Sequence, residues 1–246
     1  MHDYKCKILP SFHAIYTSDS LLTAVRIILK VGAKELFRIF ETKDPEYLNP
    51  AEPFGTTPDS IYDSQSYLSV YHLVGHPEKK AFTDRCKKAE NALIAAEILD
   101  ANTPFFGDIP AVRKKEFQNF VAATITRHWE AANVNAGVLI ELLGLGNVSF
   151  EKGFSGKIAR EVASDAIGSL NSRLIAGVVY PLVSLISHCD PNVSPLNHAT
   201  NGKMVVMAHR ATQKGEALHV MYNGGFCFMN INTRQAHLDG SYFFTR

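Results

Sequence analysis

The hydrophobic pattern of this chain changes near Asn133, and this change most constrains the fold. Before it, apolar residues recur at the three- and four-residue spacing of a buried helix face, as in "SDSLLTAVRIILKVGAKELFRIF". After it come short β-prone runs, "KMVVMAHRA" and "EALHVMYN", separated by "TQKG", a turn with a suitably placed glycine. We therefore expect an α+β fold, with helices first and short strands later.

Four helical segments are predicted in the first half, at residues 18–40, 60–75, 84–100 and 114–133. Ser18 or Ser20 is the expected cap of the first segment, and Gly32 its break. The face expected for the third is Ala89, Leu93 and Ala96, with Leu99 or Asp100 as a further member, and the face expected for the fourth is Phe117, Phe120, Val121 and Thr124. Residues 15–132 should accordingly form a bundle of about four helices.

Composition excludes several classes of protein. With 46 % apolar and 20 % charged residues, the 246-residue chain has an ordinary globular composition. A formal net charge of +1 gives no electrostatic attraction to nucleic acid or to an anionic membrane. No uninterrupted apolar run approaches the roughly 18 residues of a membrane span. The four cysteines form no disulfide framework, which favours a reducing cytosolic or nuclear setting.

Two motifs in the second half carry the strongest functional signal. They are "YPLVSLISHCDPN" at 180–192 and "RATQKGEALHVMY" at 210–222. Their order, the spacing inside the second motif and its terminal Tyr222 resemble the SET domain of protein-lysine methyltransferases, most closely the SET-and-MYND family. That family reads Tyr/Phe-Pro-x-x-Ser-Leu-Leu-Asn-His-Ser-Cys-x-Pro-Asn and then Arg-x-Ile-x-x-Gly-Glu-Glu-Leu-x-x-x-Tyr. The segments "RHWEAANVNAGV", "TRQAHLDGSYFF" and "HDYKC" also resemble parts of the family, so the likeness runs nearly end to end.

The resemblance implies a fold, a reaction and a set of site residues. Residues 1–14 would be the end of a MYND zinc finger, 15–132 a helical insert and 133–246 the C-terminal part of a SET domain. The cofactor would be S-adenosyl-L-methionine, and the substrate would be a lysine of a histone or non-histone protein. The enzyme would be a monomer in the cytoplasm or the nucleus. Tyr222 would line the reacting centre and Tyr242 the lysine channel, while Asn135, Ser187 and His188 would bind the cofactor. Such a site must keep the lysine amine neutral and in line with the methyl group.

Several departures from the family pattern leave an alternative open. "ISHCDPN" is one residue short, and Ser187 stands where the family has Asn, whose planar amide offers both a donor and an acceptor. The chain is expected to be truncated at both ends: it has no Cys-x-x-Cys, and its only Gly-x-Gly, at 144–146, comes too late in the order. His2 and Cys6 alone fall short of the four or so ligands of a zinc site, so zinc is expected only if the missing flanking segments are present. The alternative function is therefore a catalytically inactive SET-like scaffold that binds other proteins.

Purely structural roles for the same residues also stay open. His188 and Cys189 fit a buried loop, Tyr222 a strand aromatic in a core, and Asn135 a helix cap or loop. Cys189 lacks a paired base in the order that a nucleophile requires. No metal-ligand set is expected within the chain.

Overall fold

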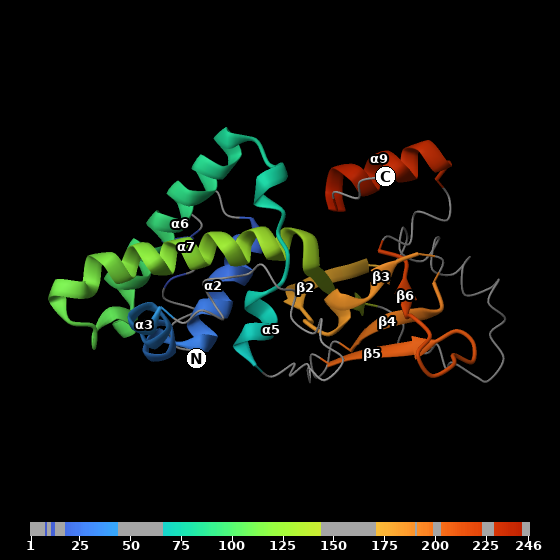
Figure 1. The fold of residues 1–246 in the computed structure, drawn as a ribbon, viewed down its shortest axis with the longest axis horizontal. Coiled ribbons are helices and arrows are strands. Elements are labelled where there is room, and N and C mark those ends of the chain that lie inside the picture. Colours follow the sequence, from blue (N-terminus) through green and yellow to red (C-terminus); the bar gives the residue numbers. More distant parts are fainter. Residues whose placement is uncertain are drawn as a thin grey trace.

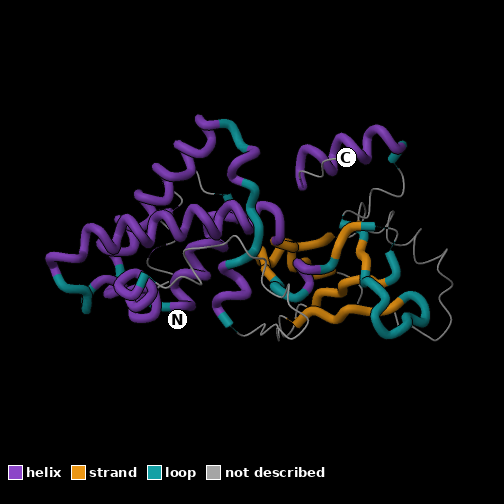
Figure 2. The backbone as a smooth tube through the Cα atoms, in the orientation of Figure 1, coloured by secondary structure: helices purple, strands orange, loops and turns teal. Residues whose placement is uncertain are grey.

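The structure is a computed structural model, and it describes residues 8, 11–12, 18–43, 66–143, 171–189, 191–198, 203–222 and 229–242. The helices of the first half pack together in one part, and the strands of the second half lie beside them (Figures 1 and 2). The α+β prediction is confirmed in this general form. No helix in the described ranges combines the length and the apolar character needed to cross a membrane.

The helical part is built from five α-helices and two short 3₁₀ helices among the described residues. They are α2 (Asp19–Val31), α3 (Ala33–Thr42), α5 (Tyr67–Tyr71), η1 (Pro77–Lys79), α6 (Phe82–Asn102), η2 (Pro104–Phe106) and α7 (Ala111–Asn135). Of the helix predicted at 60–75, the described portion is helical only over α5. The helix α7 runs past the expected domain boundary at 132/133, and the strand β1 begins directly after it.

The start and end of α2 follow from its sequence. Ser18 is the N-cap: its backbone is extended, and its hydroxyl oxygen accepts a hydrogen bond from the backbone N–H of Leu21 at 3.3 Å. Gly32 has φ 87°, a left-handed value that glycine adopts without strain, and it separates α2 from α3. Of the two caps predicted for this helix, the structure uses Ser18.

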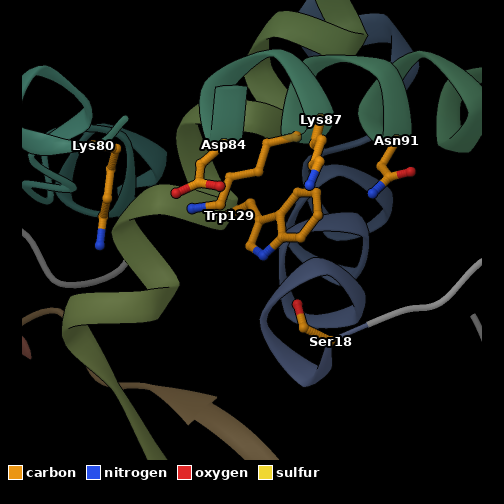
Figure 3. Close-up of a pocket in the computed structure, with 7 residues that line it drawn as sticks. Ser18, Lys80, Asp84, Lys87, Asn91 and Trp129 are labelled. Carbon is orange, nitrogen blue, oxygen red and sulfur yellow. The ribbon is translucent and has the colours of Figure 1, made fainter. Parts of the chain in front are cut away.

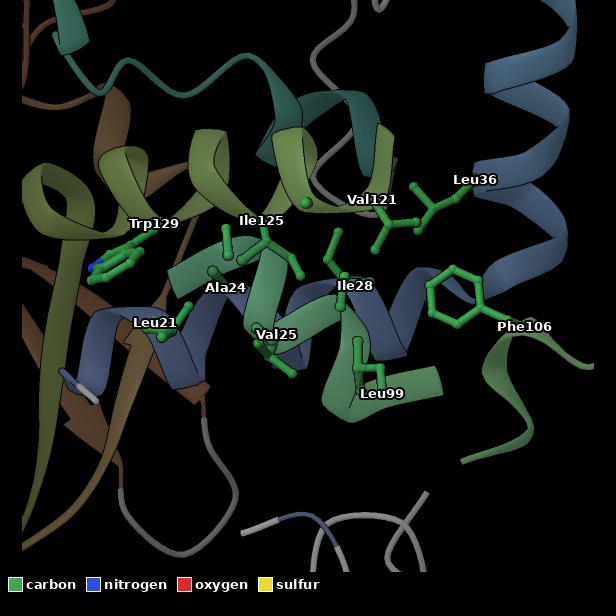
Figure 4. Close-up of a cluster of buried hydrophobic side chains, with 14 of the residues drawn as sticks. Leu21, Ala24, Val25, Ile28, Leu36, Leu99, Phe106, Val121, Ile125 and Trp129 are labelled. Atoms are coloured by element: carbon green, nitrogen blue, oxygen red, sulfur yellow. The ribbon is translucent and has the colours of Figure 1, made fainter. Parts of the chain in front are cut away.

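The core lies where α2 and α6 pack on α7 (Figure 4). Its most completely buried side chains include Leu21, Ile28, Leu99, Phe117, Val121 and Ile125. The α7 face was predicted correctly, since Phe117, Val121 and Thr124 are buried and Phe120 packs against the cluster. Each fully buried side chain of this size contributes about 1.5–3 kcal/mol relative to an exposed one.

The buried face of α6 agrees with the prediction only in part. Ala96 and Leu99 are buried as expected, whereas Ala89 is exposed, 44 % of Leu93 is exposed, and Ala92 and Ala95 are buried instead. Several faces of this alanine-rich helix offer a plausible apolar stripe, so its own sequence does not select one. Packing against α7 selects the face whose small side chains permit close approach.

The described strands form three two-stranded sheets. In the first, β1 (Ala136–Leu143) pairs antiparallel with β2 (Asn171–Val179), with an irregularity between Leu139 and Ile140. In the second, β4 (Val193–His198) pairs antiparallel with β5 (Lys203–Ala208), and in the third, β3 (Ser187–His188) pairs parallel with β6 (His219–Val220). The helix α9 (Ile231–Tyr242) follows.

Both β-prone runs of the sequence contain a strand, but these two strands do not pair with each other. The first run holds β5, which pairs with β4, and the second holds β6, which pairs with β3. Gly215 lies in the turn between them and has φ 87°. A Cβ at this position would have no other atom within 4 Å, so glycine is favoured there by the backbone conformation and not by a lack of space.

Candidate functional site

The two sequence motifs meet at the short parallel pair of β3 and β6. Ser187 lies opposite His219 and His188 opposite Val220. The pairing continues beyond the strands, because the backbone N–H of Cys189 donates to the carbonyl of Val220 at 3.3 Å. The end of the first motif therefore lies beside the end of the second, and we call residues 186–189 with 220–222 the His188–Tyr222 site.

Three contacts hold Tyr222 at this site. Its ring lies 5.2 Å from the His188 ring, centroid to centroid, at 47°. Its backbone N–H donates to Nδ1 of His188 at 3.1 Å, and its hydroxyl donates to the carbonyl oxygen of Ile186 at 3.0 Å. The phenol hydroxyl thus bonds the residue that directly precedes β3.

Burial favours the neutral form of the His188 imidazole. Desolvation lowers the pKa of His188 below its usual value; a hydrogen bond with the Val220 backbone opposes this, and the positive charge of Arg234 adds to it. A neutral ring agrees with the hydrogen bond from Tyr222, since Nδ1 must be unprotonated to accept it. Arg234 belongs to α9.

Asn192 fastens the first motif to the strand β6. This side chain is 4 % exposed; its Oδ1 accepts from the N–H of His219 at 2.8 Å, and its Nδ2 donates to the carbonyl of Ala217 at 2.9 Å. Its backbone N–H also donates to the carbonyl of His219 at 3.2 Å. Asn192 is the last residue of "YPLVSLISHCDPN", but the sequence alone did not mark it as a site residue. A buried side-chain amide whose oxygen and nitrogen are both hydrogen-bonded to the backbone orders the turn.

A charged pair shapes the turn that leads into β6. The Arg210 guanidinium bonds the Glu216 carboxylate, which also accepts from the backbone N–H of Gln213 at 3.0 Å. These two hydrogen bonds, the one from Arg210 foremost, lower the pKa of Glu216 to about 2. Both residues belong to the second motif, so the motif contains the contacts that order its own turn.

Ser187 and Cys189 flank His188 with exposed side chains. The Ser187 hydroxyl makes no hydrogen bond to any residue that the structure describes. Each exposed side chain is therefore accessible beside a partly buried imidazole.

Of the remaining predicted residues, Asn135 makes its described side-chain contacts elsewhere. The Asn135 amide nitrogen donates to the carbonyls of Val74 and Ala131, both at 2.8 Å, rather than to Ser187, His188 or Tyr222. Both of its amide hydrogens are thereby used to close the end of α7. Tyr242 is the last residue of α9, and its side chain lies outside what is described, as do His2 and Cys6.

Over the described ranges, no three His, Cys, Asp or Glu side chains gather in a way that could hold a metal ion. Comparison with protein-family models, with curated proteins and with solved structures finds no match to this chain. What the site can do must therefore be argued from its own geometry.

Proposed function

We propose that this protein is a SET-type protein-lysine N-methyltransferase that uses S-adenosylmethionine. The observation that carries the proposal is the meeting of His188 and Tyr222 through the β3–β6 pair. The two residues come from separate motifs that resemble the family, and in the family those motifs build one pocket. A chance likeness in each motif would not require the two to pack against each other.

The chemistry of the residues at the site fits such a cofactor in part. Bound S-adenosylmethionine would supply an electrophilic methyl group. The Tyr222 hydroxyl donates a hydrogen bond to the carbonyl oxygen of Ile186. A phenol oxygen in this role suits weak C–H···O contacts with a methyl group. The neutral His188 ring and the exposed Ser187 hydroxyl offer packing and a polar contact without an unfavourable positive charge beside a sulfonium.

A specific observation favours the second candidate, a SET-like scaffold without catalysis. Both side-chain amide hydrogens of Asn135 are used within the helical part, which leaves only the side-chain oxygen Oδ1 of this amide for a cofactor. Ser187 offers one hydroxyl where the family has a planar amide. A lost ligand hydrogen bond weakens binding by about 1–3 kcal/mol, or roughly ten- to hundred-fold.

Calorimetric titration with S-adenosylhomocysteine separates the two candidates. The enzyme should bind it saturably, whereas the scaffold should stay folded and give no heat of binding. Methyl transfer to lysine-containing proteins, histone and non-histone, should then fall at least tenfold in Tyr222→Phe, because the proposal assigns the phenol oxygen to the reacting centre.

Tyr67→Phe is the matched control for this experiment. It also removes one phenol hydrogen bond, the 2.7 Å contact with Nε2 of His128, but it does so inside the helical part. Equal losses of activity in both variants would point to a general loss of stability rather than a role for Tyr222. A flat calorimetric titration of folded wild-type protein would exclude the enzyme.

A further inference from the structure

One side of the helix α6 carries an exposed apolar stripe. The side chain of Phe82 is 71 % exposed and that of Leu93 44 %, and Cys86 and Ala89, which lie between them, are exposed as well. Single exposed apolar side chains are common on folded proteins, but these four follow one another at intervals of four, three and four residues. That spacing places them on one side of a helix, as in the seam along which two helices pair in a coiled coil. We call these four residues the α6 stripe.

The α6 stripe is turned away from the packed sides of the helix. Figure 3 shows Lys87 and Asn91 directed from α6 toward Trp129 of α7, with which they line an open pocket. At about 3.6 residues per turn, the stripe lies roughly on the opposite side of α6 from these two side chains and about a quarter turn from the buried face. The helix itself lies on the outside of the helical part (Figure 1). A second helix can therefore lie along the stripe without displacing α7.

Opposite charges flank the α6 stripe. When the stripe occupies the a and d positions of a heptad, Arg85 falls at g and Glu90 at the following e, one on each side of the seam. Both side chains are exposed, and neither makes an ion pair with any residue that the structure describes. Within α6 they are five residues apart, too far to pair with each other, because neighbours on a helix surface are three or four residues apart. In two parallel helices, however, a g residue lies beside the e residue five positions later in the other helix.

We propose that the α6 stripe binds the same stripe of a second copy of this chain, with the two helices parallel and related by a two-fold axis. Arg85 of each copy then lies beside Glu90 of the other, which gives two equivalent ion pairs. Antiparallel helices would bring like flanks together instead, so Arg85 and Glu90 would not meet. The two-fold axis carries the remainder of the two copies to opposite sides of the helix pair, so their helical parts do not compete for space.

The contact is small, since the stripe spans fewer than two heptads. We therefore expect a weak dimer, with a Kd on the order of 0.1 mM, in which the apolar stripe supplies the affinity and the charges set the orientation. The family resemblance implies a monomer, and in this respect the proposal departs from it. The proposal does not depend on methyl transfer.

Cys86 makes the contact testable by cross-linking. At an a position of a parallel pair, Cys86 faces Cys86 of the second copy, within reach of a disulfide. Oxidation by diamide, which takes up the two thiol hydrogens, should give a covalent dimer that peptide mapping shows to be linked through Cys86. Cys86→Ser should abolish this dimer, whereas Cys189→Ser, which removes the other exposed cysteine of the described residues, should leave it. No covalent dimer, or linkage only through other cysteines, overturns the proposal.

A charge swap tests the orientation of the two helices. In sedimentation equilibrium of the reduced protein, Glu90→Arg should weaken the dimer about tenfold, and so should Arg85→Glu, because each brings like charges together. The double variant Arg85→Glu/Glu90→Arg restores opposite charges and should return the Kd to within about threefold of wild type. Glu97→Arg is the matched control: it is the same change at an exposed position of α6, but it faces Ala92 of the second copy and should leave the Kd unaltered.

Three results of this experiment would contradict the proposal. The first is a monomer at every concentration up to about 1 mM. The second is a double variant that stays weak although circular dichroism shows it to be folded. The third is an equal weakening in Glu97→Arg, which would mean that the overall charge of the protein, rather than this register of the two helices, controls association.

Discussion

Replacing His128 by glutamine should flatten the acid side of the stability profile. This histidine is 1 % exposed in the helical core; its Nε2 lies 2.7 Å from the Tyr67 hydroxyl, and its Nδ1 has no partner in the described part of the chain. Burial, and then the charge of Arg127, lower the pKa of His128 from 6.5 to about 3. Glutamine does not titrate, and its terminal amide reaches the position of Nε2, so the contact with Tyr67 can be kept.

The sign and size of the effect follow from proton linkage. The unfolded chain protonates His128 below pH 6.5, whereas the folded protein does so only near pH 3. The stability due to the neutral ring is therefore complete above pH 6.5 and is lost as the pH falls toward 3. Each pKa unit is worth about 1.4 kcal/mol, so the loss reaches roughly 4–5 kcal/mol over the whole window.

Urea unfolding, followed by the helical circular dichroism signal between pH 8 and pH 4, measures this effect. The difference in unfolding free energy between wild type and His128→Gln should change by about 1.4 kcal/mol per pH unit below pH 6, in favour of the variant. Taking the difference removes the titration of carboxylates common to both proteins. A parallel profile for His128→Gln would refute a buried neutral imidazole.

Two further predictions concern close contact and charge. A Cβ at Gly75 would lie 2.6 Å from Cβ of Glu130, so Gly75→Ala should destabilise the protein by about 1–3 kcal/mol in chemical unfolding. In contrast, Gly240→Ala, inside α9 and with nothing within 4 Å, should stabilise by about 0.5–1 kcal/mol; equal effects would contradict the packing. Arg210→Ala should raise the pKa of Glu216 from about 2 toward its usual value in a carboxyl NMR titration, and an unchanged pKa would exclude the ion pair as its cause.

Local interactions account for what was predicted correctly. A cap such as Ser18, a break such as Gly32 and an apolar stripe such as that of α7 involve residues within a few positions of one another. Such signals can be read from the chain because the helix itself brings these residues together. The α6 face was predicted only in part, because its alanine-rich sequence has more than one apolar stripe and the neighbouring α7 selects among them.

The pairing of the strands illustrates the opposite case. The runs that contain β5 and β6 could be recognised as β-prone, but β-propensity carries no information about the partner strand. Similarly, α9 went unrecognised because its polar sequence has little helical periodicity; of its described side chains only Leu238 is buried. Contacts between distant segments depend on the rest of the fold, which no local window contains.

By itself, the sequence determined the α+β class, the capped and striped helices of the first half, and the two motifs around His188 and Tyr222. Only the tertiary structure decided that these motifs lie side by side, that the amide of Asn135 is used within the helical part, and that Lys88 of α6 meets the buried carboxylate of Glu130 in α7. The physical reason is range. The residues that cap or pattern a helix lie within one or two turns of each other, whereas each of these contacts joins residues far apart in the sequence. Forming such a contact closes a long loop, and the packing of the whole chain must offset the conformational entropy that is lost.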